Sequence, residues 1–232
     1  MLDEQFPEIT LPLSAAQLSR LPRNPAYAYR VEGNEVRLTP EPKVVHALLP
    51  FEKSLRAVVV ADEFSIRKLS SADWPELRSL FFEAFSTTLP FSVKTVTDAQ
   101  QLADACVTRT EQGEDGPLVE SACHVMLQSR GQRIVGASLV TLTPAGPLSD
   151  FSHPDWESMP PDDAVALNWG RPHLTWVFVS PSFSRRGLAS RLLHSSIAEL
   201  QQLGFAEMSS TFLADNTPSL LWHWQMGFEL PH

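Results

Sequence analysis

The spacing of apolar residues after position 64 predicts a short strand followed by two helices. The strand covers about residues 64–69, where apolar and polar residues alternate. Residues 70–73 then offer the short polar side chains that start helices. Five apolar residues recur on one helical face of the first helix: Leu77, Leu80, Phe81, Ala84 and Phe85. The same spacing predicts a second helix over about 97–109, with Cys106 packed in the core rather than acting as a nucleophile.

The second half of the chain has the pattern of strands separated by one long helix. The segment 174–179 is nearly continuous in apolar and β-favouring residues, which is typical of a strand covered on both faces. The order of elements predicts an α/β fold, with a mixed sheet and one strand–helix–strand crossover near its end. The predicted elements are an antiparallel strand pair at 121–128 and 133–143, a strand at 174–179, a helix at 184–203, a strand at 207–213 and a short helix at 217–225.

The first sixty residues are rich in proline and differ from the rest of the chain. Tyr27, Tyr29 and Val31 alternate with polar or small residues, and Gly33-Asn34 suits a two-residue hairpin loop. We therefore expect residues 1–60 to be an extension with a β-hairpin at about 26–38, ahead of a domain at 61–232. The hairpin is either a surface flap or a contributor to the active site.

Composition and charge narrow the class of protein. With 43% hydrophobic and 19% charged residues, the chain has the composition of an ordinary globular protein. The acidic start and the absence of a long apolar run predict a cytoplasmic protein without a membrane segment. The only two cysteines are not in a zinc-binding pattern, so we expect no metal. The net charge of −9 argues against nucleic acid and suits, weakly, a cationic acceptor.

The segment that points to chemistry is 179–190, between a buried strand and the first turn of the long helix. The start of a helix exposes unpaired backbone N–H groups and the positive end of the helix dipole. Gly187 lets a phosphate approach the backbone, and Arg185 and Arg186 add positive charge. The segment predicts a pyrophosphate site. The alternative is a plain helix start with two solvated arginines.

This segment resembles the central motif of the GNAT acetyltransferases. In that family a strand and Val-x-Pro lead into a phosphate loop, Gln/Arg-x-x-Gly-x-Gly/Ala, ahead of an amphipathic helix. The loop here is Ser184-Arg185-Arg186-Gly187-Leu188-Ala189. It matches the family at Gly187 and Ala189 and departs from it at Ser184, where Arg185 could compensate.

A second GNAT motif is similar to the segment that follows. The family has an Asn, then a Tyr about seven residues later, then Gly-Phe. Here Asn216, His223 and Gly227-Phe228 stand at those places, so His223 replaces the Tyr. The similarity covers roughly residues 62–230 and leaves the first sixty residues out.

The resemblance implies a GNAT-like fold whose sheet splays open between the strands at 174–179 and 207–213, with acetyl-CoA as cofactor. The pantetheine arm would pair with the strand backbone, the loop N–H groups would hold the pyrophosphate, and Asn216 would contact the arm. The implied cofactor-binding residues are Val177, Phe178, Val179, Ser184, Arg185, Arg186, Gly187, Leu188, Ala189, Ser190 and Asn216.

The resemblance also implies direct transfer of an acetyl group to a primary amine, with a strand N–H near Val177 stabilising the oxyanion. His223 would protonate the leaving thiolate, since imidazole can donate a proton at neutral pH. Its alternative role is structural packing between two tryptophans. For the general base, His173, Thr175, the acidic residues of the 150–163 loop and a water chain stay open. The alternative function is a noncatalytic acyl-CoA-binding sensor or regulatory module.

The sequence ends at His232, where the family's final pair of strands should begin. Something should cover that edge of the sheet, because an open edge invites aggregation. We expect the 26–38 hairpin or a second copy of the chain in a homodimer to cover it, unless the sequence is a shortened form.

Overall fold

The computed structural model describes residues 9–11, 27–40, 43–53, 63–129, 132–148, 163–214 and 216–230. The chain divides into two compact units. The first unit contains Met1–Val45 and Phe212–Trp222, and the second contains His46–Thr211 and His223–His232. The second unit holds most of the predicted site residues.

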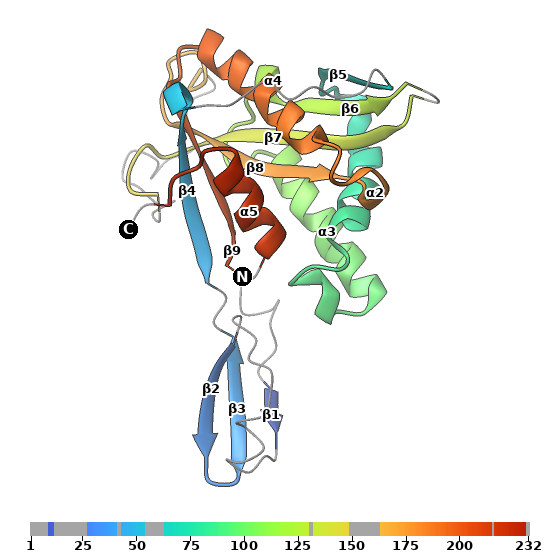
Figure 1. The fold of residues 1–232 in the computed structure, drawn as a ribbon, viewed down its shortest axis with the longest axis vertical. Coiled ribbons are helices and arrows are strands. Elements are labelled where there is room, and N and C mark those ends of the chain that lie inside the picture. Colours follow the sequence, from blue (N-terminus) through green and yellow to red (C-terminus); the bar gives the residue numbers. More distant parts are fainter. Residues whose placement is uncertain are drawn as a thin grey trace. The chain divides into compact units, whose positions relative to one another are not determined.

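The first unit contains a three-stranded antiparallel sheet, with strand order β1-β3-β2 (Figure 1). Its strands are β1 (Ile9–Leu11), β2 (Tyr27–Glu32) and β3 (Glu35–Pro40). Glu32 pairs with Glu35 across the Gly33-Asn34 turn, where Gly33 has a φ of 64°. The hairpin predicted at 26–38 is therefore present, with the register that a two-residue turn imposes.

A six-stranded sheet, with strand order β4-β9-β8-β7-β6-β5, is the framework of the second unit. The β8–β9 pair is parallel, whereas the β5–β6, β6–β7 and β7–β8 pairs are antiparallel. The predicted mixed α/β fold is confirmed. The strands are β4 (Val44–Pro50), β5 (Phe64–Lys68), β6 (His124–Gln128), β7 (Ile134–Thr143), β8 (Arg171–Val179) and β9 (Glu207–Leu213).

Helices cover both faces of the sheet. On one face, α2 (Trp74–Phe85) packs against β7, β8 and α3 (Val96–Glu111), and the ring centre of Phe81 lies 4.7 Å from that of Trp176. On the other face, α4 (Leu188–Gln202) packs against β6, β7 and β8. The last helix is α5 (Thr217–Gln225). No helix in the described ranges is long and apolar enough to cross a membrane.

Several of the apolar positions that predicted α2 and α3 lie in the core, and the others are half-buried. Leu77, Leu80 and Phe81 are buried, and Thr95 caps α3 by accepting a hydrogen bond from the Asp98 N–H at 3.2 Å. Cys106 faces inward, and burial raises the pKa of its thiol to about 11. The thiol is therefore protonated and unreactive at neutral pH, as expected of a packing residue.

Three predicted boundaries are wrong, two of them for local reasons. The strand expected from residue 174 already begins at Arg171. The strand expected from residue 121 begins at His124, because Glu120–Ala122 form a 3₁₀ turn. The helix expected from residue 184 begins at Leu188, because Pro181–Phe183 form another 3₁₀ turn and Gly187 adopts the left-handed conformation just before the helix. Residues 184–187 of the predicted phosphate loop thus precede the helix, and Leu188 and Ala189 are its first two residues.

The edge of the sheet beside β9 is covered by β4, not by the 26–38 hairpin. The Phe51 N–H donates to the Ala206 carbonyl at 2.8 Å, and the Ala214 N–H donates to the Lys43 carbonyl at 2.9 Å. The reversed order of these partners makes β4 and β9 antiparallel. The strands of the hairpin belong to a separate sheet. The strand at 44–50 is not among the predicted elements, although the apolar run before Pro50 is a signal for one.

The loop after α3 gives a test of backbone geometry in this fold. Gly116 has a φ of 109°, and a Cβ at this position would lie 1.9 Å from the Leu142 carbonyl oxygen. We expect Gly116→Ala to lower the free energy of unfolding by about 3 kcal/mol.

Gly113→Ala is the matched control. Gly113 lies in the same loop at a φ of 76°, but a Cβ at this position would lie 3.9 Å from its nearest neighbour, the Gly116 carbonyl oxygen. We expect this variant to cost about 1 kcal/mol. Urea denaturation of both variants checks the difference, and equal losses would show that the approach to Leu142 does not matter.

Candidate functional site

The central feature of the candidate site is a fork between β8 and β9. These parallel strands pair only at His173 with Ser209 and at Leu174 with Ser210. Beyond Leu174, β8 stays paired with β7 as far as Val179, but in the described residues it forms no further pair with β9. The sheet therefore splays open at the predicted place.

A β-bulge lies at the branch point of the fork. Leu139 of β7 pairs with Trp176, and the next residue, Val140, pairs with Leu174, so Thr175 is the extra residue. Bulges bend a strand and increase its twist. The bulge thus marks the position at which β8 turns away from β9.

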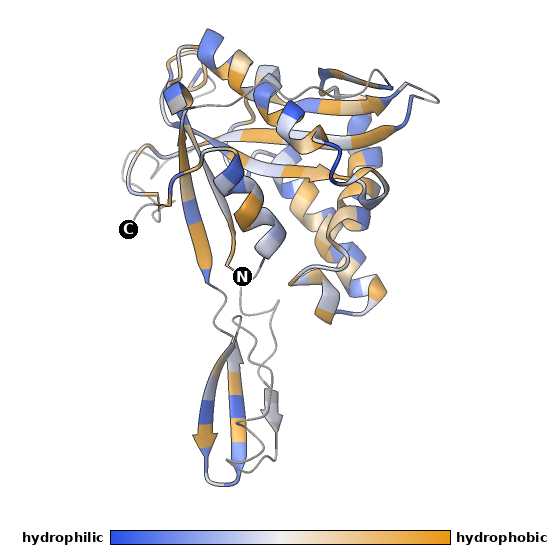
Figure 2. Cartoon of the chain, viewed as in Figure 1, coloured by the Kyte–Doolittle hydropathy of each residue, from blue (hydrophilic) through white to orange (hydrophobic). Residues whose placement is uncertain are grey.

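The predicted phosphate loop follows β8 directly and is held by apolar contacts at both ends. Before the loop, Phe183 packs edge-on against Phe64, with ring centres 5.6 Å apart. After the loop, Leu188 is 2% exposed, in a core cluster with Phe64 and Leu192. Residues 184–186 between these two anchors are exposed. Figure 2 shows the loop in the blue of hydrophilic residues.

The loop conformation places several amides at the start of α4 ahead of the first helical hydrogen bond. That bond runs from the Arg191 N–H to the Gly187 carbonyl, at 3.0 Å. The amides of residues 188–190 precede it and lie at the positive end of the helix dipole. Arg185 and Gly187 both have positive φ, 59° and 76°. Residues with such dihedrals can turn N–H groups toward an anion.

The loop arginines add positive charge at the same place. Arg186 donates a hydrogen bond to Glu63 at 2.8 Å and lies over the Phe183 ring, 5.4 Å from its centre. Both partners of this ion pair are about half exposed, so the pair is weak and can exchange for a stronger anion. Arg186 is thus an exposed arginine in a weak surface ion pair, and its contact with a phosphate stays a prediction.

The other predicted cofactor residues lie in different environments. Val177 and Val179 are half-buried on β8, and Phe178 is buried against Phe81 of α2. Asn216 belongs to the first unit, and its side-chain oxygen accepts a hydrogen bond from the Ser219 N–H at 3.1 Å. This bond caps the start of α5, so the Asn216 side chain has a structural role.

His223 lies inside the second unit, beside the fork. It is 3% exposed, its ring contacts the Phe228 ring at 4.7 Å, and its Nε2 lies 3.0 Å from the Ser210 hydroxyl. Ser210 in turn donates a hydrogen bond to the Leu174 carbonyl at 3.2 Å. Because this uses the only proton of the hydroxyl, His223 donates to Ser210. The imidazole is thus connected to the last paired residues of the fork.

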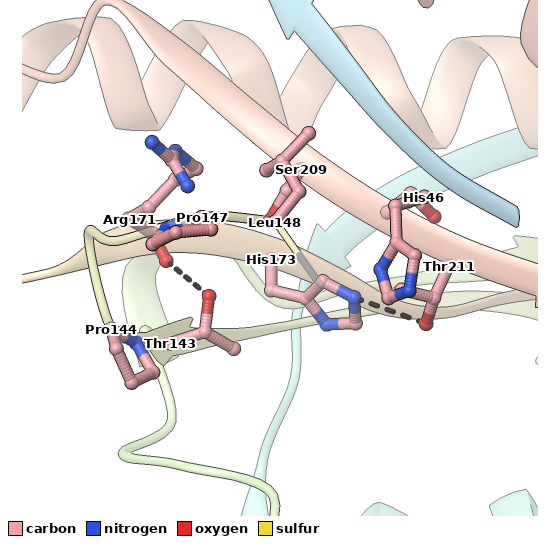
Figure 3. A pocket seen from close by; sticks show the side chains of 10 residues that line it. His46, Thr143, Pro144, Pro147, Leu148, Arg171, His173, Ser209 and Thr211 are labelled. Carbon is pink, nitrogen blue, oxygen red and sulfur yellow. Dashed lines mark hydrogen bonds between the residues drawn. The ribbon is translucent and has the colours of Figure 1, made fainter. Parts of the chain in front are cut away.

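His173 and Thr175, two of the candidate bases, form a second polar group at the fork. The His173 Nδ1 lies 3.2 Å from the Thr175 hydroxyl, and its Nε2 lies 3.3 Å from the Thr211 hydroxyl of β9. Figure 3 shows the His173 ring directed at Thr211, with His46 of β4 beside it. Burial, with the nearby His46 and His223, lowers the pKa of His173 to about 4. His173 is therefore neutral at pH 7.

Sequence reasoning missed three of these residues, namely His46, Ser210 and Thr211. The signal for the last two was the run of hydroxyl residues, Ser209-Ser210-Thr211, in the middle of a buried strand. The acidic residues proposed as bases fall mostly in 149–162, outside the described residues.

Comparison with known families identifies the fold. A profile described as the acetyltransferase (GNAT) family matches residues 74–228, about two thirds of the chain. The chain belongs to the GNAT acetyltransferase family. Acetyl-CoA is the acyl donor of GNAT enzymes. Comparison with curated proteins gives no match.

Solved GNAT structures resemble the chain at low sequence identity. A GCN5-related N-acetyltransferase from Sphaerobacter thermophilus is 14% identical with a TM-score of 0.54, and the alignment covers 97% of this chain but only 56% of that protein. A PaiA N-acetyltransferase from Thermoplasma acidophilum, solved with coenzyme A, is 11% identical over 72% of this chain and 91% of that one, with a TM-score of 0.49. The likeness to the Sphaerobacter protein supports the fold, and the chain spans little more than half of its length.

The described residues fit the GNAT donor. Five consecutive residues of β8, from Thr175 to Val179, offer a strand edge toward the gap, and an amide-rich loop with two arginines lies at the end of that edge. A strand edge suits the amide groups of pantetheine, and the loop suits a pyrophosphate.

The buried histidine gives a test of site electrostatics. In the unfolded chain His173 takes up a proton near pH 6.5, but in the folded protein it does so only near pH 4. Unfolding therefore takes up a proton between these values, and the stability falls as the pH is lowered. We expect His173 to contribute about 3 kcal/mol to this loss.

Urea denaturation between pH 7 and pH 4 measures the loss, with His173→Asn as the comparison. The variant is expected to be less stable at pH 7 but to show a shallower fall, because residue 173 no longer titrates. Parallel curves for the two proteins would contradict the shifted pKa.

Proposed function

We propose that this chain is an acetyl-CoA-dependent N-acetyltransferase that moves an acetyl group directly to a primary amine. The observation that carries the proposal is the run of β8 from its last pair with β9 to the loop before α4, which has no β9 partner in the described residues. At the fork end this run has two imidazoles, and at the loop end it has amides and arginines. The acceptor amine is not specified by these features.

The β8 edge and the loop would hold the donor. The backbone of Val177, Phe178 and Val179 would pair with the pantetheine arm as a further strand, and the amides of residues 185–190 would hold the pyrophosphate. Ser184 and the two arginines would add polar contacts. Three strand residues span about 10 Å, so an arm fixed at the loop extends back toward the fork.

The chemistry would take place at the fork. The acyl donor supplies an activated thioester carbonyl, whose carbon is attacked by the amine while its bond to sulfur breaks. A strand N–H near Val177 would stabilise the negative charge on the carbonyl oxygen. His223 would donate a proton to the leaving thiolate, since its imidazole lies beside the branch point. The division into an extension at 1–60 and a domain at 61–232 stays a prediction, and so does the contact from Asn216.

The phosphate loop can be tested separately from the arm. Gly187 has a φ of 76°, so Gly187→Val introduces strain and adds a side chain where the pyrophosphate would approach the backbone. We expect acetyl-CoA affinity to fall at least tenfold, roughly 1.4 kcal/mol, in calorimetric titration.

S-acetylpantetheine is the matched control ligand, because it has the arm and thioester but lacks the pyrophosphate. Its affinity for Gly187→Val should equal its affinity for the wild type. If both ligands weaken together, the substitution disturbs the whole site. If neither weakens, the loop does not hold the phosphates.

The role of His223 is tested by removing its proton and keeping its packing. His223→Phe preserves an aromatic ring against Phe228. We expect thiol release from acetyl-CoA in the presence of an amine to slow by roughly 100-fold, with little change in acetyl-CoA affinity.

Trp224→Phe is the control, because Trp224 is the neighbouring ring and is 71% exposed. It should leave the rate unchanged. An unchanged rate in His223→Phe would assign His223 to packing alone. Binding of acetyl-CoA by the wild type without amine-dependent thiol release would instead contradict the transferase.

A further inference from the structure

The His173 ring bridges the two arms of the fork through both of its nitrogens. Its Nδ1 contacts Thr175, the bulged residue of β8, and its Nε2 contacts Thr211, the first residue of β9 beyond the last β8–β9 pair. Each hydroxyl thus stands on one side of the opening. His173 is 6% exposed, whereas Thr211 is only half-buried, so Thr211 is the member that a bound molecule can reach.

The hydrogen bonds around His173 fix the direction of each proton. Thr141 donates to the Asp115 carbonyl at 3.0 Å, so its 2.8 Å contact with Thr175 has Thr175 as the donor. The hydroxyl proton of Thr175 is also within reach of the His173 carbonyl, at the longer distance of 3.3 Å. Because its only proton is used in this way, the Thr175 oxygen accepts a hydrogen bond from the His173 Nδ1–H. The Nε2 lone pair of His173 then accepts the hydroxyl proton of Thr211.

The two imidazoles lie on opposite faces of the sheet. Ser210 and Thr211 are neighbours on β9, so their side chains point to opposite faces. His223 contacts Ser210, and His173 contacts Thr211. The His173 face is that of α3, since Trp176 and Thr175 on β8 both connect to the network around Thr110 and Asp115.

We propose that Thr211 and His173 form a hydroxyl–imidazole pair that removes the proton from the acceptor amine. The proposal rests on the proposed function, which directs the thioester end of the arm toward the fork. The acceptor then enters from the α3 face, and the leaving sulfur is protonated from the His223 face. Thr211 is the catalytic residue that touches the amine, and His173 acts through it.

The step balances without a further reactant. The amine nitrogen forms a bond to the carbonyl carbon, and the carbon–sulfur bond breaks. Thr211 receives one proton from that nitrogen as its own hydroxyl proton passes to the His173 Nε2. The thiolate takes a proton from the imidazolium form of His223, which becomes a neutral imidazole. His173 then releases its extra proton to solvent, and His223 takes up a proton from solvent, so both rings return to their starting state. The net reaction converts an amine and a thioester into an amide and a thiol.

The groups that face His173 permit this role. His46 of β4 and the nearby His223 disfavour a charged His173, and burial acts in the same direction. Arg171, which lines the same small cavity, is already bound to Glu207 at 2.8 Å and to the Gly146 carbonyl at 2.9 Å. A neutral His173 keeps its lone pair for Thr211. The positioned imidazole then acts as general base in the transition state, as the nitrogen bonds to the carbonyl carbon and becomes more acidic.

Turnover of Thr211→Val tests the catalytic role, since valine keeps the shape of threonine but lacks the hydroxyl. The assay is thiol release from acetyl-CoA with benzylamine, spermidine or a tripeptide with an N-terminal alanine. We expect a loss of roughly 100-fold in kcat, with acetyl-CoA affinity unchanged and loss of the solvent deuterium isotope effect. Thr211→Ser should restore most of the rate. Ser209→Ala is the matched control, because Ser209 lies on the same face and its hydroxyl donates to the Pro172 carbonyl at 3.4 Å.

A second measurement does not depend on turnover. Nitrogen-15 NMR of labelled histidine should show His173 at pH 7 as the Nδ1–H tautomer, with an Nε2 signal that shifts in Thr211→Val. An Nε2–H tautomer would overturn the pair, and so would a Thr211→Val rate within threefold of the wild type. If the tautomer is as expected but no amine is acetylated while acetyl-CoA binds, the proposed transferase function fails, and the catalytic role of the pair fails with it.

Discussion

The rest of the site depends on how few residues join β8 to β9. Two pairs hold the parallel strands together, and beyond them the backbone of β8 faces a gap. Backbone N–H and C=O groups without partners cost roughly 1–3 kcal/mol each when buried, so such an edge favours a ligand that can pair with it. β7 stabilises β8 where β8 has left β9. It pairs with the other edge of β8 from Arg171 to Val179.

The fork also separates the two halves of an acyl transfer. Neighbouring residues of β9 point to opposite faces, so Ser210 and Thr211 present one hydroxyl to each side of the sheet. Each hydroxyl forms a hydrogen bond with a buried histidine, Ser210 with His223 on one face and Thr211 with His173 on the other. A reacting carbonyl at the branch point would therefore have a proton donor on one side and a proton acceptor on the other. This arrangement follows from strand geometry alone and needs no moving part.

Much of the fold could be predicted from the sequence, because periodicity and loop chemistry are local properties. The helix spacing of residues 77–85, the continuous apolar strand at 174–179 and the Gly33-Asn34 turn each fix an element without reference to the rest of the chain. The predicted start of α4 is wrong because a glycine such as Gly187 is compatible with either a helix interior or a left-handed cap. The contact of His173 with Thr211 could not be predicted, because it joins residues 38 positions apart in the chain.

β4, the strand that the sequence analysis did not predict, explains how β9 can separate from β8. A strand that leaves its neighbour needs other partners, or it exposes both edges. For β9 the other partner is β4, which lies antiparallel to it on the side away from β8. β4 is itself held by Glu229, which exchanges two hydrogen bonds with Leu48, at 2.9 and 2.7 Å. These residues of β4 precede the part of the chain that matches the GNAT family, at 74–228. β9 can diverge from β8 because β4 holds it from the other side, and the same strand brings His46 beside His173. The segment before the family match therefore contributes both to the opening of the site and to its electrostatics.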